Sequence, residues 1–179
     1  MSAPPFRRSG PLRLSVVVAG FVVTGVVAGI VWEWWWTPPT GVTVDGEWYL
    51  DPEGVQDDFS GTGVYVVVAS VAGLLLGIVS ALTARSHELA TLVAVAVGSA
   101  AAAGIMALTG AALGPPDPRP LAQGREDRTE IASDLGVVGA TPYAALPAGA
   151  LTGLAVLFVG THGSPARRSS EGGGTEPHG

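Results

Sequence analysis

The sequence contains no cysteine and no lysine, and only 13% of its 179 residues are charged. Without cysteine there can be no disulfide framework, thiolate metal site or cysteine nucleophile. Soluble domains carry roughly 25% charged residues, so this chain is poor in charge. Its formal net charge of −6 lacks the basic character of nucleic-acid-binding proteins, and we expect no nucleic-acid partner.

Four long apolar runs account for the 47% hydrophobic content. Crossing a hydrocarbon core about 30 Å thick takes about 20 apolar residues in a helix. The runs are apolar on all sides rather than along one stripe, and they are too long for buried strands. We therefore predict an all-α membrane protein with four transmembrane helices in a compact bundle, and the lipid bilayer as its surroundings. The predicted spans are about 14–36, 64–82, 89–113 and 142–160.

The first run could instead be a cleaved signal peptide, because Arg7, Arg8 and Arg13 precede it. The pair Arg7-Arg8 could also belong to a twin-arginine signal. However, the run is longer than the 7–15 residues typical of a signal-peptide core, and no A-x-A-like cleavage site precedes the acidic loop that follows. We interpret the run as a permanent span.

The arginines indicate an orientation. With four spans both termini lie on one side, and that side carries six of the nine arginines: Arg7, Arg8, Arg13, Arg85, Arg167 and Arg168. Cytoplasmic segments of membrane proteins are enriched in basic residues. We therefore predict a multi-pass protein of the plasma membrane with both termini in the cytoplasm. The predicted outer loops, 37–63 and 114–141, together carry a formal charge of −8.

All the tryptophans and tyrosines lie at or just beyond the outer ends of the first, second and fourth spans. Indole and phenol rings are enriched where membrane meets water. The pattern predicts an aromatic belt at the outer headgroup level, made of Trp32, Trp34, Trp35, Trp36, Trp48, Tyr49, Tyr65 and Tyr143.

The first outer loop predicts a small β-hairpin over 42–50, because β-forming residues flank Asp45-Gly46. A lone hairpin is marginal, so it should either lean on the tryptophans or pair with the second outer loop. In that second loop, the mixed-charge stretch 125–135 predicts a short helix. Residues 1–13 and 161–179 lack an apolar face, and we expect them to be disordered cytoplasmic segments.

No catalytic, cofactor-binding or metal site is predicted. Glu33 is the only ionisable residue within an apolar run, but it lies near the end of its span, where a carboxylate can reach headgroup water. The scattered His87, His162 and His178 assemble no metal site. The acidic set of the first outer loop does not match a Ca²⁺-binding loop and is interpreted as solvated charge: Asp45, Glu47, Asp51, Glu53, Asp57 and Asp58.

Each span, or its end, contains a G-x-x-x-G pair. With 26 glycines in the chain, about as many pairs would arise by chance, so they are weak evidence for specific dimer motifs. Small residues nevertheless predict that the helices approach closely. The pairs are Gly25/Gly29, Gly73/Gly77, Gly110/Gly114 and Gly149/Gly153.

Several short segments resemble a family of small four-span membrane proteins from high-GC Gram-positive bacteria, a domain family without an established activity. The resemblance covers roughly residues 14–160 and implies topology but no catalytic residue. It is carried by Gly29-Ile30-Val31-Trp32, Val42-Thr43-Val44-Asp45-Gly46, Asp58-Phe59 and Pro142.

We expect a non-enzymatic accessory or scaffolding subunit of a cell-envelope system whose outer loops contact a membrane-protein partner. The alternative is a small transporter or channel component that acts as a homo-oligomer, since four spans are few for a transport path. A third hypothesis, an enzyme acting on lipid-linked substrates at the outer face, would need Glu33, the loop carboxylates and the outer arginines Arg119, Arg125 and Arg128.

Overall fold

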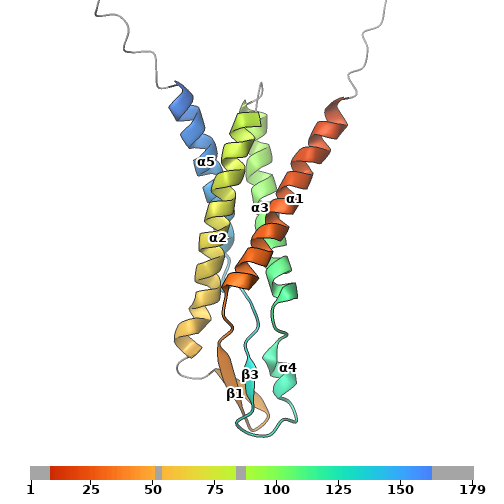
Figure 1. Cartoon of the computed structure of the whole chain (residues 1–179), viewed down its shortest axis with the longest axis vertical. Coiled ribbons are helices and arrows are strands. Elements are labelled where there is room, and N and C mark those ends of the chain that lie inside the picture. The colour runs from red at the N-terminus through yellow and green to blue at the C-terminus, as the bar shows by residue number, and fades with distance from the viewer. Residues whose placement is uncertain (1–8, 51–53, 84–87, 163–179) are drawn as a thin grey trace, which may run out of the picture.

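The computed structural model describes residues 9–50, 54–83 and 88–162. Four long helices lie side by side, and a small unit of strands with one short helix lies beyond one end of them (Figure 1). The long helices are α1 (Ser9–Trp35), α2 (Gly54–Thr83), α3 (Glu88–Leu113) and α5 (Ala145–His162). The remaining elements are β1 (Thr40–Val44), β2 (Glu47–Leu50), α4 (Pro118–Ala122), β3 (Glu130–Ala132) and the 3₁₀ helix η1 (Thr141–Ala144).

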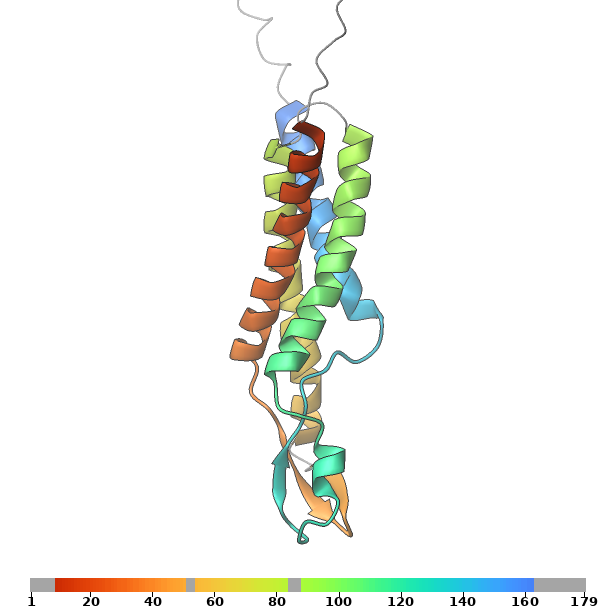
Figure 2. The same cartoon turned by 90° about the vertical axis from the view of Figure 1, so that its right-hand side faces the viewer.

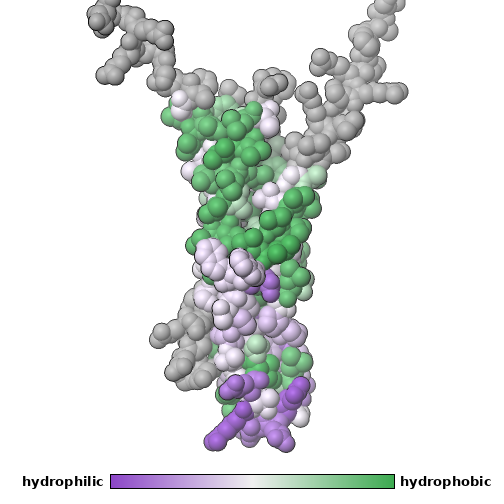
Figure 3. Space-filling model, viewed as in Figure 1, coloured by the Kyte–Doolittle hydropathy of each residue, from purple (hydrophilic) through white to green (hydrophobic). Residues whose placement is uncertain are grey.

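All four long helices contain a stretch that is long and apolar enough to cross a membrane, which confirms that part of the predicted fold. The stretches are Val18–Trp35, Ser60–Thr83, Thr91–Ala122 and Thr141–Gly160, the third of which continues past the end of α3. In Figure 3 the hydrophobic surface covers the helices and the hydrophilic surface gathers at the strand end. The chain therefore has one apolar body and one polar tip.

Two helices begin earlier than their apolar runs. α1 starts at Ser9, so residues 9–13 are helical rather than disordered as expected. α2 starts at Gly54, before the predicted span at 64. Ahead of that span, Thr62 Oγ1 accepts a hydrogen bond from Val138 N at 3.1 Å. Residues 1–8 and 163–179, for which the sequence predicts disorder, lie outside the described residues, and so does the connection at 84–87.

The helices pack as two pairs, α2 with α5 and α1 with α3, and α3 also contacts α5 (Figure 2). Glycines form the α2–α5 contact. Gly73 and Gly77 lie against the backbone of α5 at Leu146 and Ala150. In return, Gly149 and Gly153 of α5 lie against the backbone of α2, where a Cβ on Gly149 would come within 2.5 Å of the Ser70 carbonyl oxygen.

The α1–α3 contact is also made by glycines that face the backbone of the other helix. A Cβ on Gly25 would lie 2.7 Å from the Ala102 carbonyl oxygen, and one on Gly29 would lie 2.6 Å from that of Met106. Gly110 of α3 lies against the Trp32 ring. Three of the four G-x-x-x-G pairs are thus used within the chain for close approach of helix backbones, and the pair Gly110/Gly114 faces the side chains of Trp32 and Leu135 instead.

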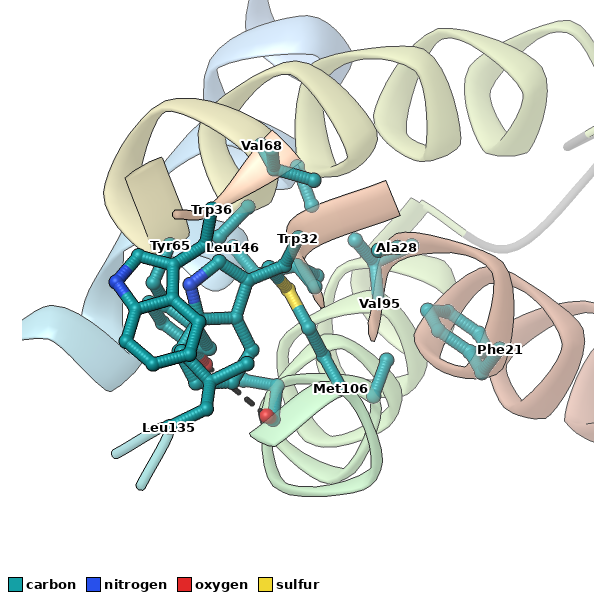
Figure 4. Close-up of a cluster of buried hydrophobic side chains, with 14 of the residues drawn as sticks. Phe21, Ala28, Trp32, Trp36, Tyr65, Val68, Val95, Met106, Leu135 and Leu146 are labelled. Atoms are coloured by element: carbon teal, nitrogen blue, oxygen red, sulfur yellow. Dashed lines mark hydrogen bonds between the residues drawn. The ribbon is translucent and has the colours of Figure 1, made fainter. Parts of the chain in front are cut away.

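An aromatic cluster fills the bundle near its strand end (Figure 4). Trp32 and Tyr65 are fully buried, with their rings packed edge to face at 5.1 Å. Trp32 Nε1 donates to the Gly61 carbonyl at 2.7 Å, and the Tyr65 hydroxyl donates to that of Ala103 at 3.0 Å. Trp36 is buried as well.

The prediction of an aromatic belt is therefore wrong for Trp32, Trp36 and Tyr65, whose rings are buried in the core. Trp34 and Trp35 are exposed as expected of a belt. Residues 32 and 36 are four positions apart and lie on one face of a helix, with residue 35 at its edge. Only the packing of the helices decides that this face points inward.

Candidate partner-binding unit at the end of the bundle

We call the unit made of β1, β2, α4 and β3 the outer unit, after the outer loops predicted from the sequence. It is built on the predicted hairpin, which the structure confirms. β1 and β2 pair antiparallel, with Val42 opposite Tyr49 and Val44 opposite Glu47. The two turn residues, Asp45 and Gly46, have φ angles of 51° and 78°. Positive φ at both central positions is the type I′ geometry that suits the twist of paired strands, and Asp-Gly is among the sequences that adopt it most readily.

The second outer loop supplies a third strand. β3 pairs antiparallel with β1 so that Gly41 lies opposite Ile131, giving the order β2-β1-β3. Just before β3 begins, Thr43 N donates to the Thr129 carbonyl at 3.0 Å, and Arg128 N donates to that of Thr43 at 2.7 Å. Of the two supports expected for the hairpin, the structure uses pairing with the second loop.

The short helix expected over 125–135 is wrong. This stretch contains a turn, in which Arg128 has a φ of 64°, followed by β3. Its backbone groups bond to β1, which local sequence preference cannot anticipate, because strand pairing depends on a partner far away in the chain. The helix of this loop lies earlier, at α4, where Asp117 Oδ1 accepts from Arg119 N at 3.0 Å.

The two faces of the sheet differ. Thr43 is buried and Trp48 half-buried on one face, and α4 packs against β2 and β3. Trp48 Nε1 donates to the Ile131 carbonyl at 3.1 Å, and its ring lies over Gly41, where a Cβ would come within 2.5 Å of it. The opposite face, which we call the open face, consists of Val42, Val44, Glu47, Tyr49 and Glu130.

Leu135 attaches the outer unit to the bundle by packing into its core. It is buried beside Trp36, in a space left by Gly61 and Gly114; a Cβ on Gly114 would lie 2.8 Å from that of Leu135. The sequence did not single out Leu135. Other apolar residues lie close to it in the loop, such as Ile131, Val137 and Val138, so no local signal set it apart.

Two hydrogen bonds support the same junction. Ser133 N donates to the Pro39 carbonyl at 2.8 Å, and Val138 N donates to Thr62 Oγ1 at 3.1 Å. The sheet is therefore held by α1, α2 and the segment that leads into α5.

Several of the charged groups considered in the sequence lie at the two turns of this unit, where Asp45 N donates to Asp127 Oδ1 at 3.0 Å. Asp45 and Glu47 are exposed at the hairpin, and Arg119, Arg125 and Arg128 are exposed on α4 and the turn after it. Glu33 is half-buried at the end of α1. The side chains of Asp51, Glu53, Asp57, Asp58 and the three histidines lie outside what the structure describes.

One polar pair lies on the open face. The Tyr49 hydroxyl donates to Glu47 Oε2 at 2.8 Å. This hydrogen bond and the negative charge of Glu47 raise the pKa of Tyr49 above its usual value near 10. Tyr49 therefore stays neutral throughout the physiological range and presents an aromatic ring beside a carboxylate.

Within residues 9–50, 54–83 and 88–162, no cluster of three or more histidine, aspartate or glutamate side chains could hold a metal ion. Every buried polar side-chain atom in those ranges has a hydrogen-bond partner. What the described part of the chain does offer is a fixed, exposed surface. No family model, curated protein or solved structure matches the chain, so its function must be argued from this surface.

Proposed function

We propose that the protein is a non-enzymatic accessory or scaffolding subunit of a cell-envelope system, which crosses the plasma membrane four times and presents the open face to another envelope protein. The observation that carries the proposal is the attachment of the sheet. Two loops far apart in sequence combine into one folded unit, and Leu135 and Trp36 fix that unit to the helices. Loops that merely connect spans need neither feature.

The orientation in this proposal rests on the arginines. Six of the nine lie in segments on the side of the termini, and the positive-inside rule places that side in the cytoplasm. The outer unit then faces the cell exterior. The same proposal places the chain among the four-span proteins of high-GC Gram-positive bacteria that its segments resemble.

The open face has the composition of an interface core with a polar rim. Val44 and Tyr49 are exposed, and the carboxylates of Glu47 and Glu130 lie beside them. Interfaces typically place aromatic and apolar side chains at the centre and charged ones at the edge. An envelope protein with a small apolar patch bordered by basic groups fits this face.

The alternative, a small transporter or channel component, draws less support. Proton-coupled transport needs ionisable groups along the path. The predicted spans 64–82, 89–113 and 142–160 contain no aspartate, glutamate, arginine or histidine, and 14–36 contains Glu33 alone. An oligomeric pore would give a ladder of homo-oligomers on native electrophoresis, whereas a scaffold would migrate with a different protein.

Site-specific photocrosslinking tests the proposal. A photoreactive residue at Tyr49 should capture one discrete envelope protein in intact membranes, and the same residue at Val156, exposed on α5, should not. Val44→Asp should release that protein on native electrophoresis, while Leu121→Asp, on α4 away from the open face, should not. Equal capture at both positions, or retention of the protein by Val44→Asp, would refute the proposal.

A further inference from the structure

The three-stranded sheet has an open edge at β3. In the order β2-β1-β3, β3 pairs with β1 on one side, and no strand of the described chain lies on its other side. Figure 2 shows β3, in cyan, as the outermost strand on its side of the sheet. The backbone N–H and C=O groups of an edge strand can pair with a strand from another protein.

The register of β3 shows which of its backbone groups face outward. Thr43 N donates to the Thr129 carbonyl, and Ser133 N donates to a carbonyl just before β1. Alternate residues of an antiparallel strand direct their backbone groups to the same neighbour. Glu130 and Ala132 therefore direct theirs away from β1. No hydrogen bond joins these outward groups to another residue that the structure describes.

Neither the local sequence nor α4 blocks this edge. Proteins often protect an edge strand with proline, a β-bulge or a covering segment. Residues 129–133 contain no proline, and the pairing of β3 with β1 runs without a bulge from Glu130 to Ala132. α4 contacts both β2 and β3, which lie on opposite sides of β1, so it covers a face of the sheet and leaves the edge free.

The direction of β3 excludes a second copy as a symmetric partner. β3 runs along the long axis of the molecule in both views (Figure 1 and Figure 2), and in the proposed topology this axis follows the membrane normal. Rotation about that normal would place each N–H group of β3 opposite the same N–H group of the other copy. β2 of another copy runs in the same direction as β3, because both are antiparallel to β1, and a β3–β2 contact between copies would not close into a dimer.

The ends of this chain are excluded as well. The helix termini at Ser9 and His162 lie at the far end of the bundle from the sheet (Figure 1). In the proposed topology, residues 1–8 and 163–179 are therefore separated from β3 by the membrane. A strand that pairs with this edge must come from a different protein.

The charges around the edge favour a basic segment. Glu130 is exposed on the open face, and Asp127 and Asp134 are exposed before and after the strand. Residues 126–134 contain four acidic side chains and one arginine. Because opposite charges on neighbouring strands attract, a lysine or arginine beside Glu130 would stabilise the pairing, and a carboxylate there would weaken it.

We propose that β3 binds an extended, basic segment of the partner envelope protein as a fourth strand of the sheet. This inference rests on the proposed function and specifies how the partner is held. The outward N–H and C=O groups of Glu130 and Ala132 form the backbone hydrogen bonds. The Glu130 carboxylate lies beside a lysine or arginine of the added strand, on the open face.

Ala132→Pro tests the backbone pairing. Proline removes an N–H group that points away from β1, and an edge strand tolerates proline in that orientation. The envelope protein identified by capture at Tyr49 should be retained roughly tenfold less by Ala132→Pro on native electrophoresis. Ala132→Ser keeps the N–H group and should retain it fully. Full retention by Ala132→Pro would overturn the proposal, whereas capture at Tyr49 would still support the proposed function.

A short peptide in which lysine and valine alternate tests the same pairing on the full chain in detergent. With the lysines on the open face, their backbone N–H groups point to β3 and those of the valines point away. Methylation of the lysine backbone nitrogens should weaken binding roughly tenfold, and methylation of the valine backbone nitrogens should not. Glu130→Lys should instead prefer the matching glutamate–valine peptide. No binding of the unmethylated peptide, or equal binding of the two methylated forms, would overturn the proposal.

Discussion

At the residue scale, glycine matters in this chain where its missing Cβ faces another backbone. Gly77 lies against Ala150, whereas the Cβ position of Gly104 is open, although both glycines lie in apolar helices. The two glycines look alike in the sequence. Replacing them with alanine should change the free energy of unfolding in opposite directions.

Gly77→Ala should destabilise the fold by about 1–3 kcal/mol, because the added methyl group forces α2 and α5 apart. Gly104→Ala should stabilise it by roughly 0.5–1 kcal/mol, because alanine favours the helix and meets no neighbour. Unfolding in detergent, followed by circular dichroism, measures both changes. If the two variants shifted stability in the same direction, the α2–α5 contact described above would be wrong.

The tryptophans give a second pair. Trp32→Phe removes the hydrogen bond to the Gly61 carbonyl in a buried site and should cost roughly 1–3 kcal/mol. Trp34, which is 83% exposed, should tolerate the same change without loss. Thermal melting in detergent distinguishes them. A Trp34→Phe variant as unstable as Trp32→Phe would mean that Trp34 packs in a folded contact too.

At the scale of elements, the attachment of the sheet to the helices depends on one leucine. Leu135 contacts the cluster around Trp36 and lies only a few residues after β3. Loss of its side chain should loosen the attachment of the sheet more than it affects the helices.

Leu135→Ala should cost about 2–5 kcal/mol in local stability, since the site is 2% exposed and a cavity would remain. Amide hydrogen exchange should quicken at Thr43 and Arg128, whose N–H groups join β1 to the second loop. Leu121→Ala, on an exposed part of α4, should leave those rates unchanged. Unaltered exchange in Leu135→Ala would show that the sheet is stable without its attachment.

At the scale of the whole molecule, the absence of cysteine makes the orientation directly testable. Single cysteines at Glu47 or Arg125 should react with a membrane-impermeant maleimide added to intact cells. A cysteine at Ser164 should react only after the membrane is opened. One at Leu108, exposed on the apolar surface of α3, should react in neither case, because thiolate forms only where water reaches. The reverse pattern would invert the proposed topology.

Sequence alone identified the four apolar helices and the hairpin, because both depend on local signals: hydropathy summed over a window, and a dipeptide that tolerates positive φ. It misplaced the helix of the second loop. That error arose because β3 pairs with β1, which is distant in the chain.

The candidate site was foreseen only in part. The first outer loop and its Asp45-Gly46 turn were recognised, but the open face requires β3 to be in register with β1. Neither the G-x-x-x-G count nor the aromatic pattern revealed which glycines touch a backbone or which rings are buried. Composition and local order determined that this chain has an apolar body, four helices and a hairpin. Tertiary structure decided which faces meet and which stay open, because residues a few positions apart on a helix differ only in what lies opposite them.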